Sequence, residues 1–141
     1  MSYTGKRWTV QDRIYNYDED TDILYISFAP GEKATSAVEL NDNILLRFNR
    51  AERRAIGITL MDYSVLVQLT NLGPRHFPLY GLRELEPEWQ EMVIDMITRP
   101  PVKQILHLSA YTPSLTETVP IALVQCPAST PTHKPEAKAS G

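Results

Sequence analysis

The chain has 141 residues, of which 43% are hydrophobic and 22% charged, and its 14 Lys and Arg against 17 Asp and Glu give a formal net charge of −3. These values predict a folded globular domain and exclude a global positive field that would attract nucleic acid or an acidic membrane. No segment reaches the ~20 apolar residues that span a bilayer, and the first residues lack the apolar run of a signal peptide. We therefore expect a cytoplasmic protein with no membrane partner.

Short apolar and β-branched runs, separated by Asp, Asn, Gly or Pro, predict antiparallel strands in the first half of the chain. The expected strands cover residues 8–17, 23–29, 35–40, 44–48 and 55–60. Apolar residues on both faces of the second predict a central strand that is covered on both sides. Asn41-Asp42-Asn43 should turn the hairpin between the third and fourth. Within the fifth, Gly57 indicates a bulge or a close neighbour, which we expect to be the following helix.

Two helices are predicted after these strands. The first is expected over 63–72, with Asp62 as its N-cap and Gly73-Pro74 as its stop, and it should lie on the sheet. The second is expected over 87–98, because Pro87 suits a first helical turn. The apolar side of this second helix consists of Trp89, Val93, Met96 and Ile97.

The remaining segments predict two more strands and a tail. Strands are expected over 102–109 and 119–124, the latter at a sheet edge because it contains Pro120. The fold class is therefore predicted as α+β: a small antiparallel β-meander with a packed helix, followed by a second helix and a β-hairpin. We expect residues 1–73 to form a meander-plus-helix unit, 74–125 to extend the same domain, and 126–141, rich in Pro, Ala, Ser, Thr and Lys, to be a disordered tail.

One motif carries a family resemblance. The sequence Tyr17-Asp18-x-x-x-Asp22-x-Leu24-Tyr25-Ile26, with Ile56-Gly57-Ile58 further on, resembles the domain of unknown function family 2283, small bacterial and archaeal proteins, over roughly residues 14–66. The resemblance implies a short strand-rich unit with a following helix and no established activity. Some members are encoded beside toxin-like proteins, which implies an antitoxin-like role as one alternative. The turn at 49–53 lacks the family's glycine, and Thr59 stands where the family has Glu.

The acids at Asp18, Asp20 and Asp22 have the alternate spacing of calcium-loop ligands. Such a loop also needs a Gly after the third acid and a Glu at its twelfth position, where this chain has Ile23 and Ala29. We therefore predict a structural turn in which Asp18 and Asp22 bond the turn's own amides. No metal and no cofactor are expected.

The candidate binding residues are Arg47, Arg50, Arg53 and Arg54, which share one hairpin with a single acid, Glu52. Guanidinium groups suit phosphates and carboxylates, so an exposed arginine tip is suited to an acidic partner or to nucleic acid. The alternative is a solvated hairpin end whose charges discourage edge-to-edge pairing.

No local catalytic constellation is present, and no catalytic residue is assigned. His76, His107 and His133 lack metal-ligand spacing, and Ser64 lacks a nucleophile elbow. Cys126 with His107 is a conceivable pair, but a cysteine at the start of the predicted tail lacks the held geometry that catalysis needs. The acids Glu84, Glu86, Glu88 and Glu91 are interpreted as a solvated helix start.

The leading hypothesis is a non-enzymatic protein-interaction module that also self-associates as a homo-oligomer. It rests on the lack of catalytic chemistry, on the expected exposed β-edges and on a charge-asymmetric surface. Most aromatic residues of the first strands should be core, and the others are candidates for an interface, where Tyr and Trp are enriched. The alternatives are a nucleic-acid-contacting or antitoxin-like regulator that uses the arginine hairpin, and an enzyme whose site residues come from distant segments.

Overall fold

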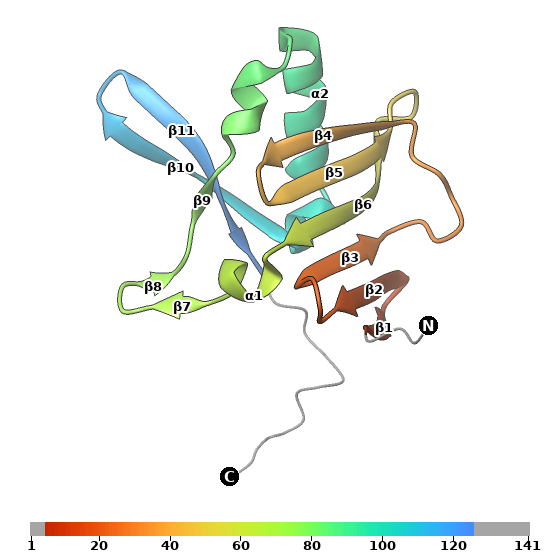
Figure 1. Ribbon diagram of the computed structural model, residues 1–141. Coiled ribbons are helices and arrows are strands. Elements are labelled where there is room, and N and C mark those ends of the chain that lie inside the picture. Colours follow the sequence, from red (N-terminus) through yellow and green to blue (C-terminus); the bar gives the residue numbers. More distant parts are fainter. Residues whose placement is uncertain (1–4, 126–141) are drawn as a thin grey trace.

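The computed structural model describes residues 5–125, and its largest element is a six-stranded antiparallel sheet (Figure 1). The six strands are β1 (Lys6–Val10), β2 (Arg13–Asp18), β3 (Ile23–Ser27), β4 (Ser36–Asn41), β5 (Ile44–Asn49) and β6 (Arg54–Met61). Their spatial order is β1-β2-β3-β6-β5-β4, so two three-stranded meanders join through β3 and β6. The mixed α+β class is confirmed, but the sheet is not one sequential meander, because the segment between β3 and β4 carries the chain to the far edge.

The predicted strand over 8–17 is in fact a hairpin. Gln11 adopts a left-handed backbone with φ 57°, and this reverses the chain between β1 and β2. Trp8 and Tyr15 then face each other across the two strands, with parallel rings 5.1 Å apart. The apolar alternation continues through the reversal, which is why the sequence alone suggested one strand.

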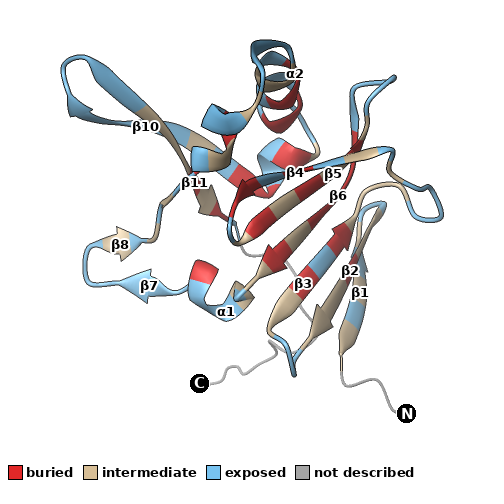
Figure 2. Cartoon of the chain, turned by 45° about the horizontal axis from the view of Figure 1, so that its top comes forward, coloured by how far each residue is buried: buried red, intermediate tan, exposed pale blue. Residues whose placement is uncertain are grey.

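Within residues 5–125, only one face of the six-stranded sheet is covered. Leu24 and Ile26 of β3 are buried, whereas Tyr25 between them is 41% exposed. The same alternation runs through β5, where Ile44, Leu46 and Phe48 are all buried. The prediction that β3 is covered on both sides is therefore wrong, because the helix and the second sheet pack on the same face (Figure 2).

The first helix is much shorter than predicted. Helix α1 covers only Tyr63–Leu66, and β7 (Leu69–Thr70) then pairs with β8 (Gly73–Pro74). The Thr70 hydroxyl accepts a hydrogen bond from the Leu72 amide and donates one to the Gly73 carbonyl. Such local side-chain bonds compete with helical ones, so the chain turns at this position. Leu72 is 99% exposed and does not lie on the sheet.

Helix α2 (Pro87–Ile97) forms where predicted and covers the inner face of the sheet. Its buried residues are Met92, Val93, Met96 and Ile97. Trp89 packs edge-on against Phe48 of β5, with the ring centres 5.9 Å apart. This helix therefore takes the place that the sequence assigned to the first one.

A second, three-stranded sheet has the order β10-β11-β9, with β9 (Phe77–Pro78), β10 (Leu106–Ser114) and β11 (Glu117–Val124). The strand predicted from residue 102 begins only at Leu106, since Val102–Gln104 forms the 3-10 turn η2. The edge position of Pro120 is also wrong, because β11 is the middle strand. The Pro120 carbonyl accepts a hydrogen bond from the Leu79 amide at 2.9 Å. Proline has no backbone N–H to donate, and none is needed at this position because β9 ends at Pro78.

The 3-10 helix η1 (Tyr80–Glu84) lies against the free edge of β4. Gly81 makes this contact, and a Cβ at this position would collide with the Glu39 carbonyl oxygen and lie 2.9 Å from that of Leu40. The predicted tail at 126–141 lies outside the described residues.

Candidate functional site

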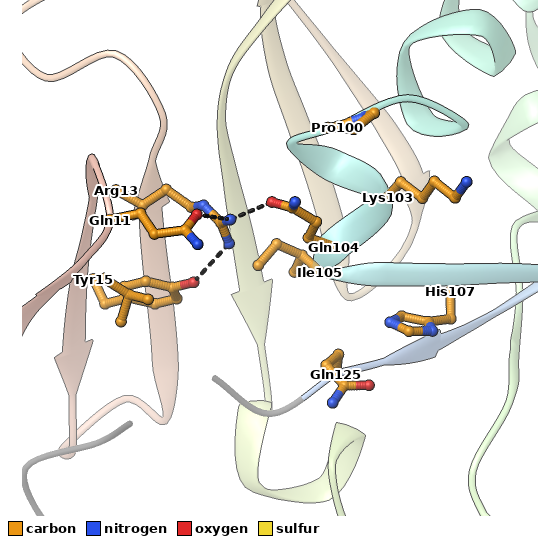
Figure 3. Close-up of a pocket in the computed structure, with 10 residues that line it drawn as sticks. Gln11, Arg13, Tyr15, Pro100, Lys103, Gln104, Ile105, His107 and Gln125 are labelled. Atoms are coloured by element: carbon orange, nitrogen blue, oxygen red, sulfur yellow. Dashed lines mark hydrogen bonds between the residues drawn. The ribbon is translucent and has the colours of Figure 1, made fainter. Parts of the chain in front are cut away.

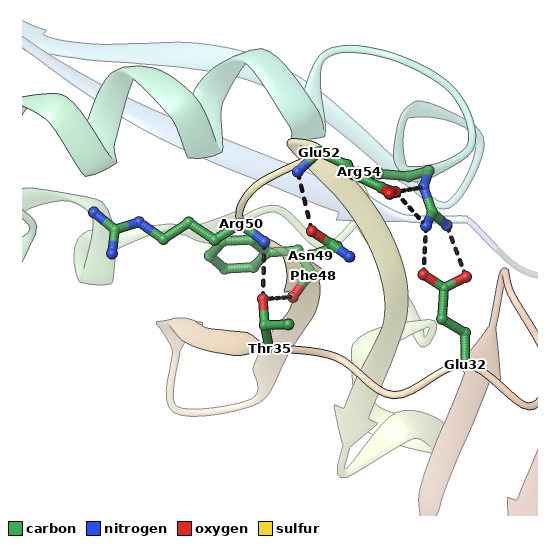
Figure 4. Close-up of polar contacts among 7 residues, drawn as sticks. All are labelled: Glu32, Thr35, Phe48, Asn49, Arg50, Glu52 and Arg54. Atoms are coloured by element: carbon green, nitrogen blue, oxygen red, sulfur yellow. Dashed lines mark hydrogen bonds and ion pairs between the residues drawn. The ribbon is translucent and has the colours of Figure 1, made fainter.

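The turn between β5 and β6 carries the predicted arginine tip. Arg50, Arg53 and Arg54 are all exposed. The turn is held by local hydrogen bonds: the Arg50 amide donates to the Thr35 hydroxyl at 2.9 Å, and the Glu52 amide donates to Asn49 Oδ1 at 3.0 Å (Figure 4). Because these bonds fix the backbone of the turn, the points from which the arginine side chains extend are fixed as well.

Arg54 is neutralised by two carboxylates. Its guanidinium donates to Glu52 Oε1 through Nε at 2.9 Å (Figure 4). It also donates to both carboxylate oxygens of Glu32, to Oε1 through Nη1 at 3.1 Å and to Oε2 through Nη2. The hydrogen bonds with Glu32 and then Glu52 raise the pKa of Arg54, and the same contact lowers the pKa of Glu32. The sequence pointed to Glu52 but not to Glu32, which comes from the loop between β3 and β4.

Arg50 and Arg53 border a groove against α2. The Arg50 guanidinium carbon lies 4.7 Å from the centre of the Trp89 ring, a cation–π geometry. Among the described residues Arg53 has no ion-pair partner. The groove has a volume of about 550 Å³ and is also lined by Thr35, Ser36, Ala51, Glu88 and Met92.

Trp89 is the site residue that sequence reasoning missed. It was assigned to the apolar side of α2, and it does contact Phe48. No local signal shows that its other surface faces Arg50, because the two residues come from different elements and meet only in the folded chain.

Arg99 joins the tip from the segment after α2. It donates to the Arg53 carbonyl at 3.2 Å and forms an ion pair with Asp95 at 3.1 Å. Arg54 and Arg99 are therefore paired with acids, whereas Arg50 and Arg53 form no ion pair with any other residue in the range 5–125.

Arg47 does not belong to this group. It alternates with Phe48 along β5 and lies on the uncovered face of the sheet, where its guanidinium crosses Gly57. A Cβ at Gly57 would collide with that guanidinium and lie 2.7 Å from the Ile26 carbonyl oxygen. A register shift of the β5–β6 pair also occurs here. The bulge and the close approach expected at Gly57 are both present, but the neighbour is Arg47 and a strand carbonyl, not a helix.

The two acids of the predicted turn behave differently. Asp18 accepts a hydrogen bond from the Asp20 amide at 3.1 Å, as expected for a turn. Asp22 closes the same turn with a left-handed backbone (φ 57°). Its carboxylate accepts from the Tyr17 hydroxyl at 2.7 Å and from the Ser64 hydroxyl at 2.6 Å, which replaces the predicted bonds to the turn's own amides. No cluster of three or more metal-ligating side chains occurs among residues 5–125.

These contacts shift two pKa values. Burial of the Tyr17 ring, followed by its hydrogen bond to Asp22, raises the pKa of Tyr17 to about 12. Burial by itself would raise the pKa of Asp22, but the hydrogen bonds from Ser64 and Tyr17 outweigh it and lower this pKa. Asp22 is therefore a carboxylate held in its charged form by donors.

His76 and His107, the histidines within the described part of the chain, are not brought together. His76 is exposed in the loop before β9, and His107 lies on β10 beside a different cavity. His133 and Cys126 lie outside the described residues, so the pairing of Cys126 with His107 stays untested. Ser64 is engaged with Asp22.

The comparisons with known proteins give one match. Residues 14–64 match the family model described as Protein of unknown function (DUF2283), which confirms the resemblance found in the opening motif. No curated protein and no solved structure matches the chain. The matched segment runs from β2 to the first residues of α1, so α2, Trp89 and the second sheet lie outside it. Within residues 5–125 no helix is long and apolar enough to cross a membrane.

Proposed function

We propose that this chain is a non-enzymatic protein-interaction module whose groove between the β5–β6 tip and α2 holds an acidic segment of a partner protein. The observation that carries this proposal is the Arg50 guanidinium lying 4.7 Å over the Trp89 ring at the edge of that groove. Arg and Trp are among the residue types most enriched at interface hot spots, where a few anchors supply most of the binding energy.

The charge distribution favours carboxylates as the groups that are bound. Arg50 and Arg53 have no ion pair among the described residues, whereas Arg54 and Arg99 already have one. An incoming carboxylate can therefore accept from either free guanidinium in a bidentate geometry.

The groove also favours a peptide over a nucleic acid. Glu88 lines the groove, and Glu32 and Glu52 lie at the same end of the sheet beside Arg54. A phosphate backbone places charges at close and regular intervals, so it would meet these acids as well as the arginines. A peptide with isolated acidic residues avoids this repulsion.

The test compares two matched double variants. A partner is first captured and purified, and its dissociation constant is then measured over a range of salt concentrations. Arg50→Ala with Arg53→Ala should weaken binding by roughly tenfold or more and reduce the salt dependence. Arg7→Ala with Arg83→Ala removes two exposed arginines elsewhere and should leave binding unchanged.

Folding should be unaffected in both double variants, within about 0.5 kcal/mol, as for ordinary surface changes. Equal affinity of the two for the purified partner would refute the groove as the binding surface. Retention of an oligonucleotide whose log–log salt slope falls by about 0.9 per lost contact in the first variant would instead favour a nucleic-acid-contacting regulator. Self-association stays a separate prediction, which sedimentation of the purified chain tests.

A further inference from the structure

A second cavity lies between the β1–β2 hairpin and the start of β10, and it shares no lining residue with the groove at Arg50 and Trp89. Its volume is about 580 Å³, within the range of small-molecule pockets. One wall comes from the hairpin through Arg13 and Tyr15, and the other from η2 and β10 through Gln104 and His107. Segments that are remote in the sequence thus build this cavity together.

Arg13 is oriented across the cavity entirely by neutral groups. Its guanidinium donates to Gln11 Oε1 at 2.9 Å, to the Tyr15 hydroxyl at 3.4 Å, and to Gln104 Oε1 (Figure 3). Tyr15 is only 1% exposed, so this part of the wall is fixed by the core. Neutral acceptors position the guanidinium without neutralising it, and no carboxylate of residues 5–125 forms an ion pair with it.

The other polar side chains that line the cavity are also neutral or basic. His107 and Gln125 add an imidazole and an amide on the side opposite Arg13, and Lys103 lies at the rim with its ammonium directed away from Arg13 (Figure 3). None of the described residues that line the cavity carries a carboxylate. The cavity therefore presents positive charge and hydrogen-bond donors without an internal counter-ion.

We propose that this cavity binds a small organic anion, a carboxylate or a phosphate ester, through Arg13 and His107. An anionic head group would accept from the guanidinium N–H groups that these contacts leave over, one on Nη1 and one on Nε, and both carboxylate and phosphate oxygens suit such donors. The apolar body of the ligand would lie on Val10, Pro100 and Ile105, which line the same cavity. The site is independent of the groove at Arg50 and Trp89.

The competing explanation is that Arg13 is only a clamp between the hairpin and η2. The two explanations differ in one measurable respect, since a clamp needs no anion, whereas a binding site must saturate with one.

The experiment is a titration of the full-length ¹⁵N-labelled protein followed by NMR at constant ionic strength. The probes are phenyl phosphate, benzoate and inorganic phosphate, which separate the phosphate head group, the carboxylate head group and the contribution of the apolar body. We expect saturable shifts at Arg13, Gln104 and His107 with phenyl phosphate or benzoate, and weaker binding of inorganic phosphate.

Arg13→Gln should weaken this binding by roughly tenfold or more, because a charged hydrogen-bond donor is lost. His107→Gln, a change at an exposed residue that leaves the clamp intact, should also weaken it. The matched control is Arg7→Gln, an exposed arginine on the opposite face of the same hairpin, which should bind as the wild type does. Shifts that do not saturate beyond an ionic-strength control, or equal affinity of the His107→Gln and wild-type proteins, would overturn the proposal.

Discussion

The carboxylate of Asp22 accepts hydrogen bonds from the amide and the hydroxyl of Ser64, at 3.0 and 2.6 Å, although the two residues are 42 positions apart. The Asp22 carbonyl also accepts from the Tyr63 amide at 2.9 Å. Asp62, which precedes α1, makes no capping bond with its side chain. The first turn of α1 is therefore capped by the β2–β3 turn, and this contact joins the beginning and the end of the family-matched segment.

Replacing Asp22 by Asn should lower the free energy of unfolding at pH 7 by about 1 kcal/mol, the usual net value of a hydrogen bond at a partly exposed site. The folded-state pKa of Asp22 is below its ordinary value of 3.8, so this stabilisation is present above that value and is lost as the pH falls below it. Urea unfolding at pH 7 and pH 3 should show the difference between wild type and variant shrinking in acid.

Asp12→Asn, at the exposed tip of the β1–β2 turn, is the control and should leave the free energy of unfolding unchanged at both pH 7 and pH 3. Some loss of wild-type stability in acid will persist in the Asp22 variant, because the pKa of Glu32 is also lowered by its bond with Arg54. A difference between the Asp22 variant and wild type that grows in acid would contradict the assigned direction of the pKa shift.

Gly57→Ala should destabilise the protein by about 1–3 kcal/mol, because the added methyl collides with the Arg47 guanidinium and the Ile26 carbonyl. Combining it with Arg47→Ala should recover only part of the loss, since the side chain can be removed but the strand carbonyl cannot. Thermal unfolding of the single and double variants measures this. Full recovery in the double variant would mean that the backbone of β3 relaxes freely.

Two leucines give a matched test of the fold. Leu24 is fully buried in β3, and its replacement by Ala should cost about 2–5 kcal/mol. Leu72 is 99% exposed beside the β7–β8 turn, and the same change should cost less than about 0.5 kcal/mol. Chemical denaturation of both variants checks the pair. A large cost at Leu72 would mean that this side chain is buried, as the predicted helix over 63–72 requires.

We propose that residues 1–73 do not fold without 74–125. Most buried hydrophobic residues of the six-stranded sheet belong to one cluster with those of α2, including Met96 and Ile97. A chain ending at residue 73 would leave the inner face of the sheet in water and should show no cooperative thermal transition. A sharp transition for this fragment would make the first 73 residues a domain of their own.

The elements that could be predicted from sequence are those in which the spacing of apolar residues along the chain matches the spacing of the buried positions. β5 alternates strictly between buried and half-buried residues, and α2 buries most of its apolar residues on one side, with Ile94 exposed, so both elements form where they were predicted. The helix after β6 was not, because the apolar spacing of Val65, Leu69 and Leu72 is helical while all three are exposed. Periodicity shows which residues share a side, but not whether another element covers that side.

The candidate site shows the same limit. Charge and turn position were sufficient to place Arg50, Arg53 and Arg54 at an exposed tip. Which of these arginines is paired, and with what, depends on residues from distant parts of the sequence: Arg54 pairs with Glu32, and Arg50 lies over the Trp89 ring. Glu32 lies in the connection that leads from β3 to β4 at the far edge of the sheet, and Trp89 lies on α2, which follows β9 and η1.

The position of η1 against β4 sets how this sheet can associate with others. A strand added at the β4 edge would have to displace η1 from Glu39 and Leu40, whereas among the described residues no strand pairs with the outer side of β1. Continuous growth of a sheet from chain to chain requires two open edges in every chain, and here one is blocked. Edge-to-edge pairing through this sheet therefore stops at two molecules related by a twofold axis and cannot propagate into a fibre.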